Sequence, residues 1–233
     1  MAEGEQRVAL LAGASGFVGR LALEILLDAP DISRVFAITR RPLGGEHPRL
    51  ANRIVQFEQI ESQLKSITCQ VALCALGTTI RQAGSEQAFR RVDVDSVLAF
   101  ARAAKAAQAQ RFVVVSSAEA DRGAKNFYLR CKGEMEEGLV GLSFQSLDIL
   151  QPSVLLGWRG EIRPLEFAAS LLLPLVNPLL VGKREPLRGI SARTVAAAML
   201  GATRSGRRGV QRYTYSGIRA LSCIKPRTVK QST

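Results

Sequence analysis

The chain has 233 residues, of which 47% are hydrophobic and 22% charged, as in an ordinary globular protein that buries a core. Four cysteines without a CxxC pair and a single histidine, His47, leave no credible zinc site and no Ser-His-Asp or Cys-His machinery beyond what His47 alone could support. The acidic, polar start lacks the basic and then apolar opening of a secretory signal, so we expect a reduced, cytoplasmic protein.

The formal net charge of +12 is concentrated at the end of the chain. Residues 183–233 contain twelve Lys or Arg and one acid, Glu185, whereas the first 182 residues carry 20 basic and 19 acidic side chains. A basic end can hold an anionic partner, but charge runs are more often solvated surface. Because no zinc finger or aromatic-interleaved RNA motif accompanies it, we expect a basic, partly flexible tail at 211–233 and no nucleic-acid partner.

Short apolar segments alternate with segments of helical periodicity along the chain. We expect strands at residues 7–12, 35–39, 54–57, 71–76, 112–115 and 147–150, and helices at 17–27, 86–107 and 127–139. This order predicts an α/β fold, a Rossmann-type doubly wound parallel sheet with helices on both faces.

No break in composition marks a linker, so we predict a single domain over residues 1–210. Its segment at about 152–200 would form a small C-terminal extension over the site at the carboxyl ends of the strands. The apolar stretch 165–181 within it is interrupted by Pro174 and Pro178 and is too short to span a bilayer comfortably. We interpret it as a buried or pocket-covering helix and expect no membrane contact.

A glycine-rich turn joins the first strand to the first helix. In Gly13-x-x-Gly16-x-x-Gly19 the first glycine permits a tight turn, the second lets backbone N–H groups approach a pyrophosphate, and the third lets helix and strand pack closely. The N-terminus of the helix that follows would face the anion with unpaired donors. No Gly-Lys-Ser/Thr follows, which excludes a P-loop. The pattern therefore predicts a dinucleotide site.

The end of the second predicted strand indicates which dinucleotide is bound. NAD enzymes place an acid there for the ribose hydroxyls, but this chain has Thr39-Arg40-Arg41. Guanidinium groups pair a 2′-phosphate in a bidentate manner. We therefore predict NADP(H) in preference to NAD(H), with a solvated basic turn as the alternative interpretation.

Tyr128 and Lys132 are spaced to lie one turn apart on the same face of a predicted helix. A nearby cation favours the phenolate and brings the phenol toward the working pH of an acid–base catalyst. Ser116 and Ser117 end the preceding strand, where a hydroxyl could polarise a substrate carbonyl. We choose Ser117 as the catalytic hydroxyl, with Ser116 as the alternative.

Together these motifs resemble the short-chain dehydrogenase/reductase superfamily. The likeness is closest to the atypical branch that includes the human Tat-interacting oxidoreductase, and it runs from about residue 7 to about residue 200. It rests on Gly13-Ala14-Ser15-Gly16, Thr39-Arg40-Arg41, the segment CALGTT at 74–79, Arg91-Val92-Asp93 and the segment 128–134.

The resemblance implies a role for each matching residue. It places the pyrophosphate against Ser15, Gly16, Phe17 and Val18, the 2′-phosphate against Arg40 and Arg41, the adenine-ribose side against Leu76 and Gly77, the nicotinamide ribose against Tyr128 and Lys132, and the nicotinamide and substrate under Val154, Leu155 and Arg163. The chain departs from the superfamily at Asp93, where an asparagine is common in the central helix, and it matches no family pattern beyond residue 210.

These observations favour an NADP(H)-binding oxidoreductase that acts on a small carbonyl or alcohol through Tyr128, Lys132 and Ser117. A non-catalytic, NADP(H)-responsive protein-binding module is the main alternative, and nucleic-acid contact through the basic end is a weaker one. We expect a dinucleotide and a small-molecule substrate as partners, no metal, and a monomer or homodimer.

Overall fold

The computed structural model describes residues 6–156 and 188–226. Within them, seven strands form one parallel sheet in the order β3-β2-β1-β4-β5-β6-β9. The strands are β1 (Arg7–Ala12), β2 (Ile32–Thr39), β3 (Leu50–Ile54), β4 (Val71–Cys74), β5 (Arg111–Val115), β6 (Ser146–Leu150) and β9 (Gly209–Tyr213). The strand order reverses between β1 and β4, which confirms the predicted Rossmann-type doubly wound sheet.

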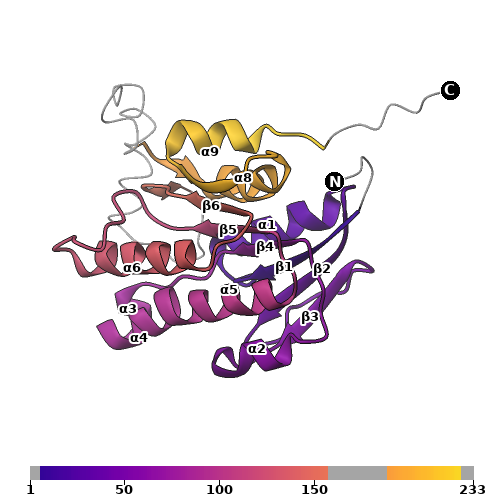
Figure 1. Ribbon diagram of the computed structural model, residues 1–233, viewed down its shortest axis with the longest axis horizontal. Helices are drawn as coiled ribbons and strands as arrows, with labels where there is room; N and C mark the ends of the chain where they lie inside the picture. Colours follow the sequence, from indigo (N-terminus) through magenta and orange to yellow (C-terminus); the bar gives the residue numbers. More distant parts are fainter. Residues whose placement is uncertain (1–5, 157–187, 227–233) are drawn as a thin grey trace.

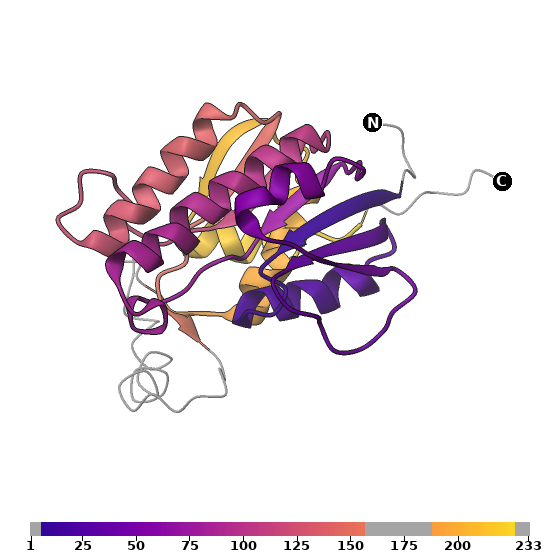
Figure 2. The same ribbon diagram turned by 90° about the horizontal axis from the view of Figure 1, so that it is seen from below.

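Helices cover both faces of the sheet, and Figure 1 shows the two helical layers above and below it. One face carries α1 (Phe17–Asp28), α8 (Ala192–Arg204) and α9 (Tyr215–Ser222). The other carries η1 (Phe57–Gln59), α2 (Ile60–Gln63), α5 (Val97–Ala106) and α6 (Phe127–Gly141), and α5 follows directly on α3 (Ile80–Ala83), α4 (Glu86–Arg90) and η2 (Arg91–Ser96). In Figure 2, α5 in magenta and α6 in salmon lie side by side.

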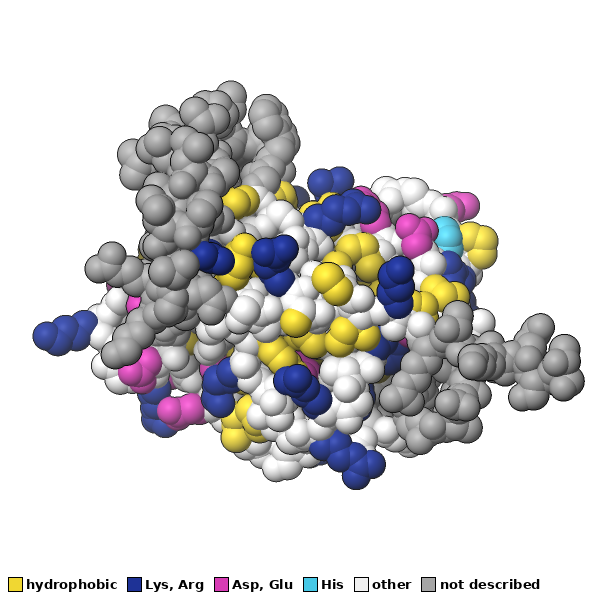
Figure 3. Space-filling view, turned by 90° about the horizontal axis from the view of Figure 1, so that it is seen from above, with side chains coloured by type: hydrophobic (Ala, Val, Ile, Leu, Met, Phe, Trp, Pro, Cys, Tyr) yellow, Lys and Arg dark blue, Asp and Glu magenta, His cyan; other side chains and the backbone are white. Residues whose placement is uncertain are grey.

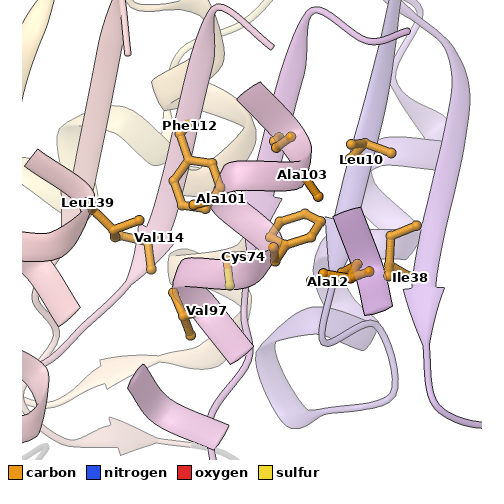
Figure 4. Packing of buried hydrophobic residues seen from close by; sticks show 14 of the residues in the cluster. Leu10, Ala12, Ile38, Cys74, Val97, Ala101, Ala103, Phe112, Val114 and Leu139 are labelled. Atoms are coloured by element: carbon orange, nitrogen blue, oxygen red, sulfur yellow. The ribbon is translucent and has the colours of Figure 1, made fainter. Parts of the chain in front are cut away.

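The core consists of two apolar clusters, one on each face of the sheet. The strands between these clusters, such as β1, β4 and β6, are buried on both faces, as their continuous apolar segments predict. On the α5 face, Ala101 lies by Phe112 of β5, and Leu139 of α6 lies beside Val114 of the same strand (Figure 4). This packing fixes the helices that carry Asp93 and Lys132 relative to the strand ends.

Two predicted segments differ from the observed elements. The strand expected at 54–57 lies earlier, at Leu50–Ile54, because β3 is an edge strand whose exposed residues give little apolar signal. The helix expected at 86–107 is continuous but contains the π-helical segment η2 between α4 and α5.

The prediction of a basic tail from residue 211 is wrong for residues 211–222. β9 pairs with β6, and the Tyr213 hydroxyl donates to the buried Asp148 carboxylate at 2.9 Å. α9 packs so closely on α8 that a Cβ at Gly201 would lie 1.9 Å from the carbonyl oxygen of Leu221. Since β9 is an edge strand, the side chain of its basic residue, Arg212, reaches solvent although its backbone is part of the sheet.

The basic side chains of the α8–α9 face are scattered singly among apolar and uncharged ones, as Figure 3 shows. Between β6 and α8 a separate pair of short strands, β7 (Leu155–Leu156) and β8 (Ile190–Ser191), frames the segment 157–187. The apolar stretch 165–181 and Arg163 lie outside the described residues. Among residues 6–156 and 188–226, no helix is long and apolar enough to cross a membrane.

Candidate functional site

The glycine-rich turn between β1 and α1 is packed so closely that Gly13 and Gly19 have no space for a side chain. Gly13 has a φ of +86°, and a Cβ there would lie 2.5 Å from the carbonyl oxygen of Ala75. A Cβ at Gly19 would lie 1.9 Å from the carbonyl oxygen of Gly13. Both contacts are too short for any side chain, so the two glycines let the turn lie against the end of β4 and against the helix.

The N-terminus of α1 presents backbone donors at this turn. Gly16 is the N-cap residue, so it has no side chain that could occupy the N–H groups of the first turn. The first turn contains no acidic residue, and Ser15 and Gly16 are exposed whereas Val18 and Gly19 are buried. An exposed helix N-terminus beside a glycine cradle fits a pyrophosphate group.

Two arginines follow β2, the strand next to β1 in the sheet. Arg40 and Arg41 are both exposed. In the part of the chain that the structure describes, neither forms an ion pair. Two guanidinium groups without an acidic partner therefore stand at the carboxyl edge of the sheet, on the side of the glycine turn.

The loop after β4 leads from the glycine turn to a buried carboxylate. The backbone N–H of Thr78 donates to Oδ2 of Asp93 at 2.8 Å. A Cβ at Gly77 would lie 3.5 Å from Oδ1 of the same residue. Leu76 and Gly77, both predicted to contact the dinucleotide, therefore lie between the glycine turn and Asp93.

Asp93 binds the lysine of the predicted catalytic pair. Its Oδ1 lies 2.6 Å from Nζ of Lys132, and the side chains of the two residues are 1% and 5% exposed. Burial by itself lowers the pKa of Lys132, but the carboxylate of Asp93 and the phenol of Tyr128 outweigh burial and leave that pKa above its usual value. The buried ammonium group therefore stays charged at neutral pH.

Tyr128 lies one turn before Lys132 on α6, as predicted. Nζ of Lys132 is 5.9 Å from the centroid of the Tyr128 ring, and the ring of Phe89 packs on the tyrosine at 5.7 Å. Tyr128 is half-buried, so the ring is held by packing while part of it reaches the surface. The structure thus joins Tyr128, Lys132 and Asp93 in one cluster.

The π-helical segment η2 places Asp93 in this cluster. It spans Arg91–Ser96, and within it Asp93 and Val94 are the buried residues. π-helical turns inside α-helices are frequent at functional sites, because the extra residue in the turn redirects side chains. The sequence motifs identified Asp93 as a departure from an asparagine but did not reveal its contact with Lys132, since 39 positions separate the two residues.

The two serines after β5 have different surroundings. The Ser116 hydroxyl donates to Oε1 of Glu136 at 2.6 Å, and the same oxygen accepts from the Gln151 amide at 2.8 Å. Arg212 of β9 pairs with the other oxygen of Glu136 at 2.9 Å. Ser116 is therefore part of a buried structural network, and Ser117, which is also buried, is the serine outside it.

Gly133 lets the loop after β5 approach α6, the helix that carries Tyr128 and Lys132. A Cβ at this position would lie 2.1 Å from the backbone nitrogen of Arg122. The N–H of Asp121 in the same loop donates to the carbonyl oxygen of Leu129 at 3.2 Å. The segment that begins with Ser117 is thus packed directly on α6, beside Lys132.

Val154 and Leu155, two of the remaining predicted site residues, come shortly before the segment 157–187 in the chain. Val154 is 42% exposed and Leu155 begins β7, whereas Arg163 is outside the described residues. Across residues 6–156 and 188–226, no three His, Cys, Asp or Glu side chains form a group that could hold a metal ion.

A parallel sheet whose order reverses beside a glycine-rich turn defines a dinucleotide-binding protein of the Rossmann class. A family model described as NAD(P)H-binding matches residues 13–155. The chain therefore belongs to this NAD(P)H-binding family, in the atypical short-chain dehydrogenase/reductase branch that its motifs indicate.

Relatives of known name support this assignment. Protein HTATIP2 of Rattus norvegicus is 37% identical over 169 residues, which cover 71% of this chain and 69% of the rat protein. The mitochondrial protein fmp52 of Emericella nidulans is 36% identical over 166 residues, which cover 68% of this chain and 71% of the fungal one.

Solved structures of low sequence identity share the fold. The enzyme WbmH of Bordetella bronchiseptica, in complex with NAD+, has a TM-score of 0.68 at 14% identity, covering 94% of this chain and 80% of its own. The UDP-Glc/GlcNAc 4-epimerase of Campylobacter jejuni has a TM-score of 0.67 at 13% identity, covering 91% and 82%.

The expectation of a cytoplasmic protein is wrong by this comparison, because several fungal relatives are named as mitochondrial proteins. The four cysteines are unpaired in the structure, as is usual in reducing compartments. They are compatible with more than one reducing compartment and could not single out the cytoplasm.

Proposed function

We propose that this protein is an NADP(H)-dependent oxidoreductase of the short-chain type that acts on a small carbonyl or alcohol. The observation that carries the proposal is the cluster of Tyr128, Lys132 and Asp93, which lies against the same loop that borders the glycine turn. A proton-transfer group and a dinucleotide cradle thereby share one edge of the sheet.

The dinucleotide is proposed to bind along the carboxyl edge, where its nicotinamide would supply or accept a hydride. The backbone of the α1 N-terminus would bind the pyrophosphate, and the loop after β4 would support the adenine-ribose side. The proposed contact residues are Gly13, Ser15, Gly16, Phe17, Val18, Gly19, Leu76 and Gly77; Arg163, the remaining proposed contact, lies outside the described residues.

Three side chains are proposed to act on the substrate. The Tyr128 phenol donates its proton to the carbonyl oxygen as the alcohol forms, and the Ser117 hydroxyl donates a hydrogen bond to the same oxygen. The Lys132 ammonium group, held by Asp93 at 2.6 Å, stabilises the phenolate that remains and binds the nicotinamide ribose. Ser117 is preferred over Ser116 because the hydroxyl of Ser116 is bonded to Glu136.

The preference for NADP(H) is proposed to come from Arg40 and Arg41, which are exposed and without an acidic partner among the described residues. Nucleotide fluorescence gives the dissociation constants of NADPH and NADH for the wild type and for Arg40→Ala/Arg41→Ala. We expect the double variant to bind NADPH at least about 10-fold more weakly, as loss of charge-assisted hydrogen bonds implies, with NADH binding unchanged. Equal affinities of the wild type for NADPH and NADH would overturn the preference.

Turnover tests the catalytic assignment. NADPH oxidation is followed through the absorbance of the reduced nicotinamide over a panel of aldehydes and ketones, and the reverse reaction over alcohols with NADP+. We expect Tyr128→Phe to lower kcat by about 100-fold or more, since it removes the general acid and leaves the ring packing intact. A Tyr128→Phe variant with full activity would contradict the assigned mechanism.

A regulatory, cofactor-responsive module is the second candidate, and the Asp93–Lys132 contact favours it. A carboxylate 2.6 Å from the ammonium group offsets part of the positive charge that an acid–base tyrosine needs beside it. This function predicts NADPH binding without turnover of any substrate, together with a protein-partner affinity that changes when NADPH is added. Turnover that depends on Tyr128 decides for the enzyme.

A further inference from the structure

A hydrogen-bonded asparagine on the edge strand of the sheet holds the loop that carries Arg40 and Arg41. Asn52 lies on β3, directly across from Ala37 of β2 in the strand register. Its side chain contacts two groups of β2, the carbonyl of Ala37 and the hydroxyl of Thr39, and the backbone N–H of Leu43 in the loop that follows. None of the sequence motifs includes this residue.

All hydrogen-bonding groups of the Asn52 amide are engaged. Oδ1 accepts the backbone N–H of Leu43 at 2.8 Å. Nδ2 donates to the carbonyl oxygen of Ala37 at 3.0 Å and to Oγ1 of Thr39 at 2.7 Å. The Thr39 hydroxyl in turn donates to the carbonyl oxygen of Arg41 at 2.8 Å.

These contacts fix the loop on both sides of the two arginines. Thr39, which is 4% exposed, precedes Arg40 and holds the carbonyl of Arg41, and Leu43 is fixed two residues later. Arg40 and Arg41 themselves remain exposed. The backbone is therefore ordered before a ligand binds, while the guanidinium groups are left available, which is the arrangement that lowers the entropic cost of binding an anion.

We infer that Asn52, acting through Thr39, is a positioning residue for the discrimination of NADPH from NADH. The inference rests on the proposed role of Arg40 and Arg41 and extends it to the side chains that pre-order them. It predicts that loss of Asn52 weakens NADPH binding without an equal loss for NADH, because the adenine ribose without a 2′-phosphate does not need the arginines.

The test compares dissociation constants of NADPH and NADH, measured by nucleotide fluorescence, for the wild type, Asn52→Ala and Thr39→Val. Thr39→Val replaces the hydroxyl by a methyl of similar size and keeps the buried position filled, so it provides a second variant if Asn52→Ala does not fold. We expect each variant to raise the NADPH constant about 5- to 10-fold, roughly the loss of one hydrogen bond between neutral groups, and the NADH constant less than about 2-fold.

Gln70→Ala is the matched control. The amide oxygen of Gln70 also accepts a backbone N–H, that of Val8 at 2.8 Å, but this bond lies at the amino ends of the strands, away from Arg40 and Arg41. Gln70→Ala should leave the ratio of the two constants unchanged. In the Arg40→Ala/Arg41→Ala background, Asn52→Ala should no longer alter the ratio.

The outcomes separate this inference from the proposed function. A wild type that binds NADPH and NADH equally removes the NADP preference and with it the inference. A wild type that prefers NADPH, together with Asn52→Ala and Thr39→Val variants that keep the preference or lose both nucleotides equally, overturns the positioning role alone.

Discussion

Two arginines at the amino ends of the parallel strands share an acidic partner, whereas two at the carboxyl ends have none among the described residues. We call these two ends of the sheet its amino edge and its carboxyl edge. At the amino edge, Arg7 of β1 and Arg204 of α8 both bind Asp31, and Nε of Arg204 lies 2.9 Å from Oδ2 of that residue. At the carboxyl edge, Arg40 and Arg41 are exposed and have no acidic partner within the described residues.

This difference separates a structural cluster from a candidate binding surface. The Asp31 cluster joins the start of β1, the turn before β2 and the end of α8, and Arg7 also donates to the carbonyl oxygen of Thr203 at 2.8 Å. Each of its charged groups has a partner of opposite charge within the chain. The carboxyl edge leaves cations and backbone donors facing solvent, and ligands of doubly wound sheets bind at that edge.

The largest effect should follow from removing the buried carboxylate of the carboxyl edge. Asp93→Ala leaves the Lys132 ammonium group buried without a counter-charge, and we expect it to lower the free energy of unfolding by about 3–5 kcal/mol. Urea unfolding measures this loss. Asp93→Asn removes the same charge but keeps an acceptor for the Thr78 N–H, so most of the loss should remain in it. An Asp93→Asn variant as stable as the wild type would contradict the role of the charge.

The glycine turn should give the next largest effect. A Cβ at Gly19 would lie 1.9 Å from the carbonyl oxygen of Gly13, so Gly19→Ala must displace the turn. We expect a loss of about 3 kcal/mol, the upper part of the range for overpacked positions, and loss of dinucleotide binding. Gly141→Ala, at a position open to solvent, is the control. Unchanged stability and binding in Gly19→Ala would show that the turn is not closely packed.

Replacing Asp31, whose carboxylate Arg7 and Arg204 share, should lower the free energy of unfolding by about 2 kcal/mol, as loss of hydrogen bonds to charged groups does. Burial raises the pKa of Asp31, but the hydrogen bond and charge of Arg204 and the charge of Arg7 outweigh it, so the net shift is downward. A lowered pKa means that the contribution is present above the unfolded-state value near 4 and is lost as the pH falls through the folded-state value.

Asp31→Asn lacks this contribution at every pH. The stability difference between wild type and variant, measured by urea unfolding, should therefore be constant from pH 7 to about 5 and shrink below about pH 4. A difference that grows on acidification would give the opposite sign and rule out the Asp31 cluster as its source.

The smallest effect on stability should come from Arg41→Ala, which we expect to change the free energy of unfolding by no more than about 0.5 kcal/mol, as for exposed residues without partners. Arg204→Ala removes a paired guanidinium and should lower the melting temperature clearly while leaving NADPH affinity unchanged. Thermal unfolding and nucleotide titration of both variants check the contrast. A destabilised Arg41→Ala variant with unaltered NADPH binding would reverse the roles of the two edges.

Local signals in the sequence were sufficient for the elements that lead to the glycine turn and to Tyr128. β1 has the predicted bounds, and α1 and α6 begin at the predicted residues, because each combines an apolar pattern with a clear start. β9 was missed, since a short edge strand of mostly exposed residues carries no such pattern. The pairing of Asp93 with Lys132 was also missed, because it depends on how α6 packs beside η2.

The sequence by itself determined the dinucleotide turn, the spacing of Tyr128 and Lys132, and the alternation of strands and helices that produces a parallel sheet. These features depend on residues that are neighbours in the chain, where sterics and periodicity act directly. The tertiary structure decided which charges are paired and which are free. Asp31 binds Arg204 across 173 positions and Asp93 binds Lys132 across the packed helices, and such contacts follow from packing rather than from local sequence.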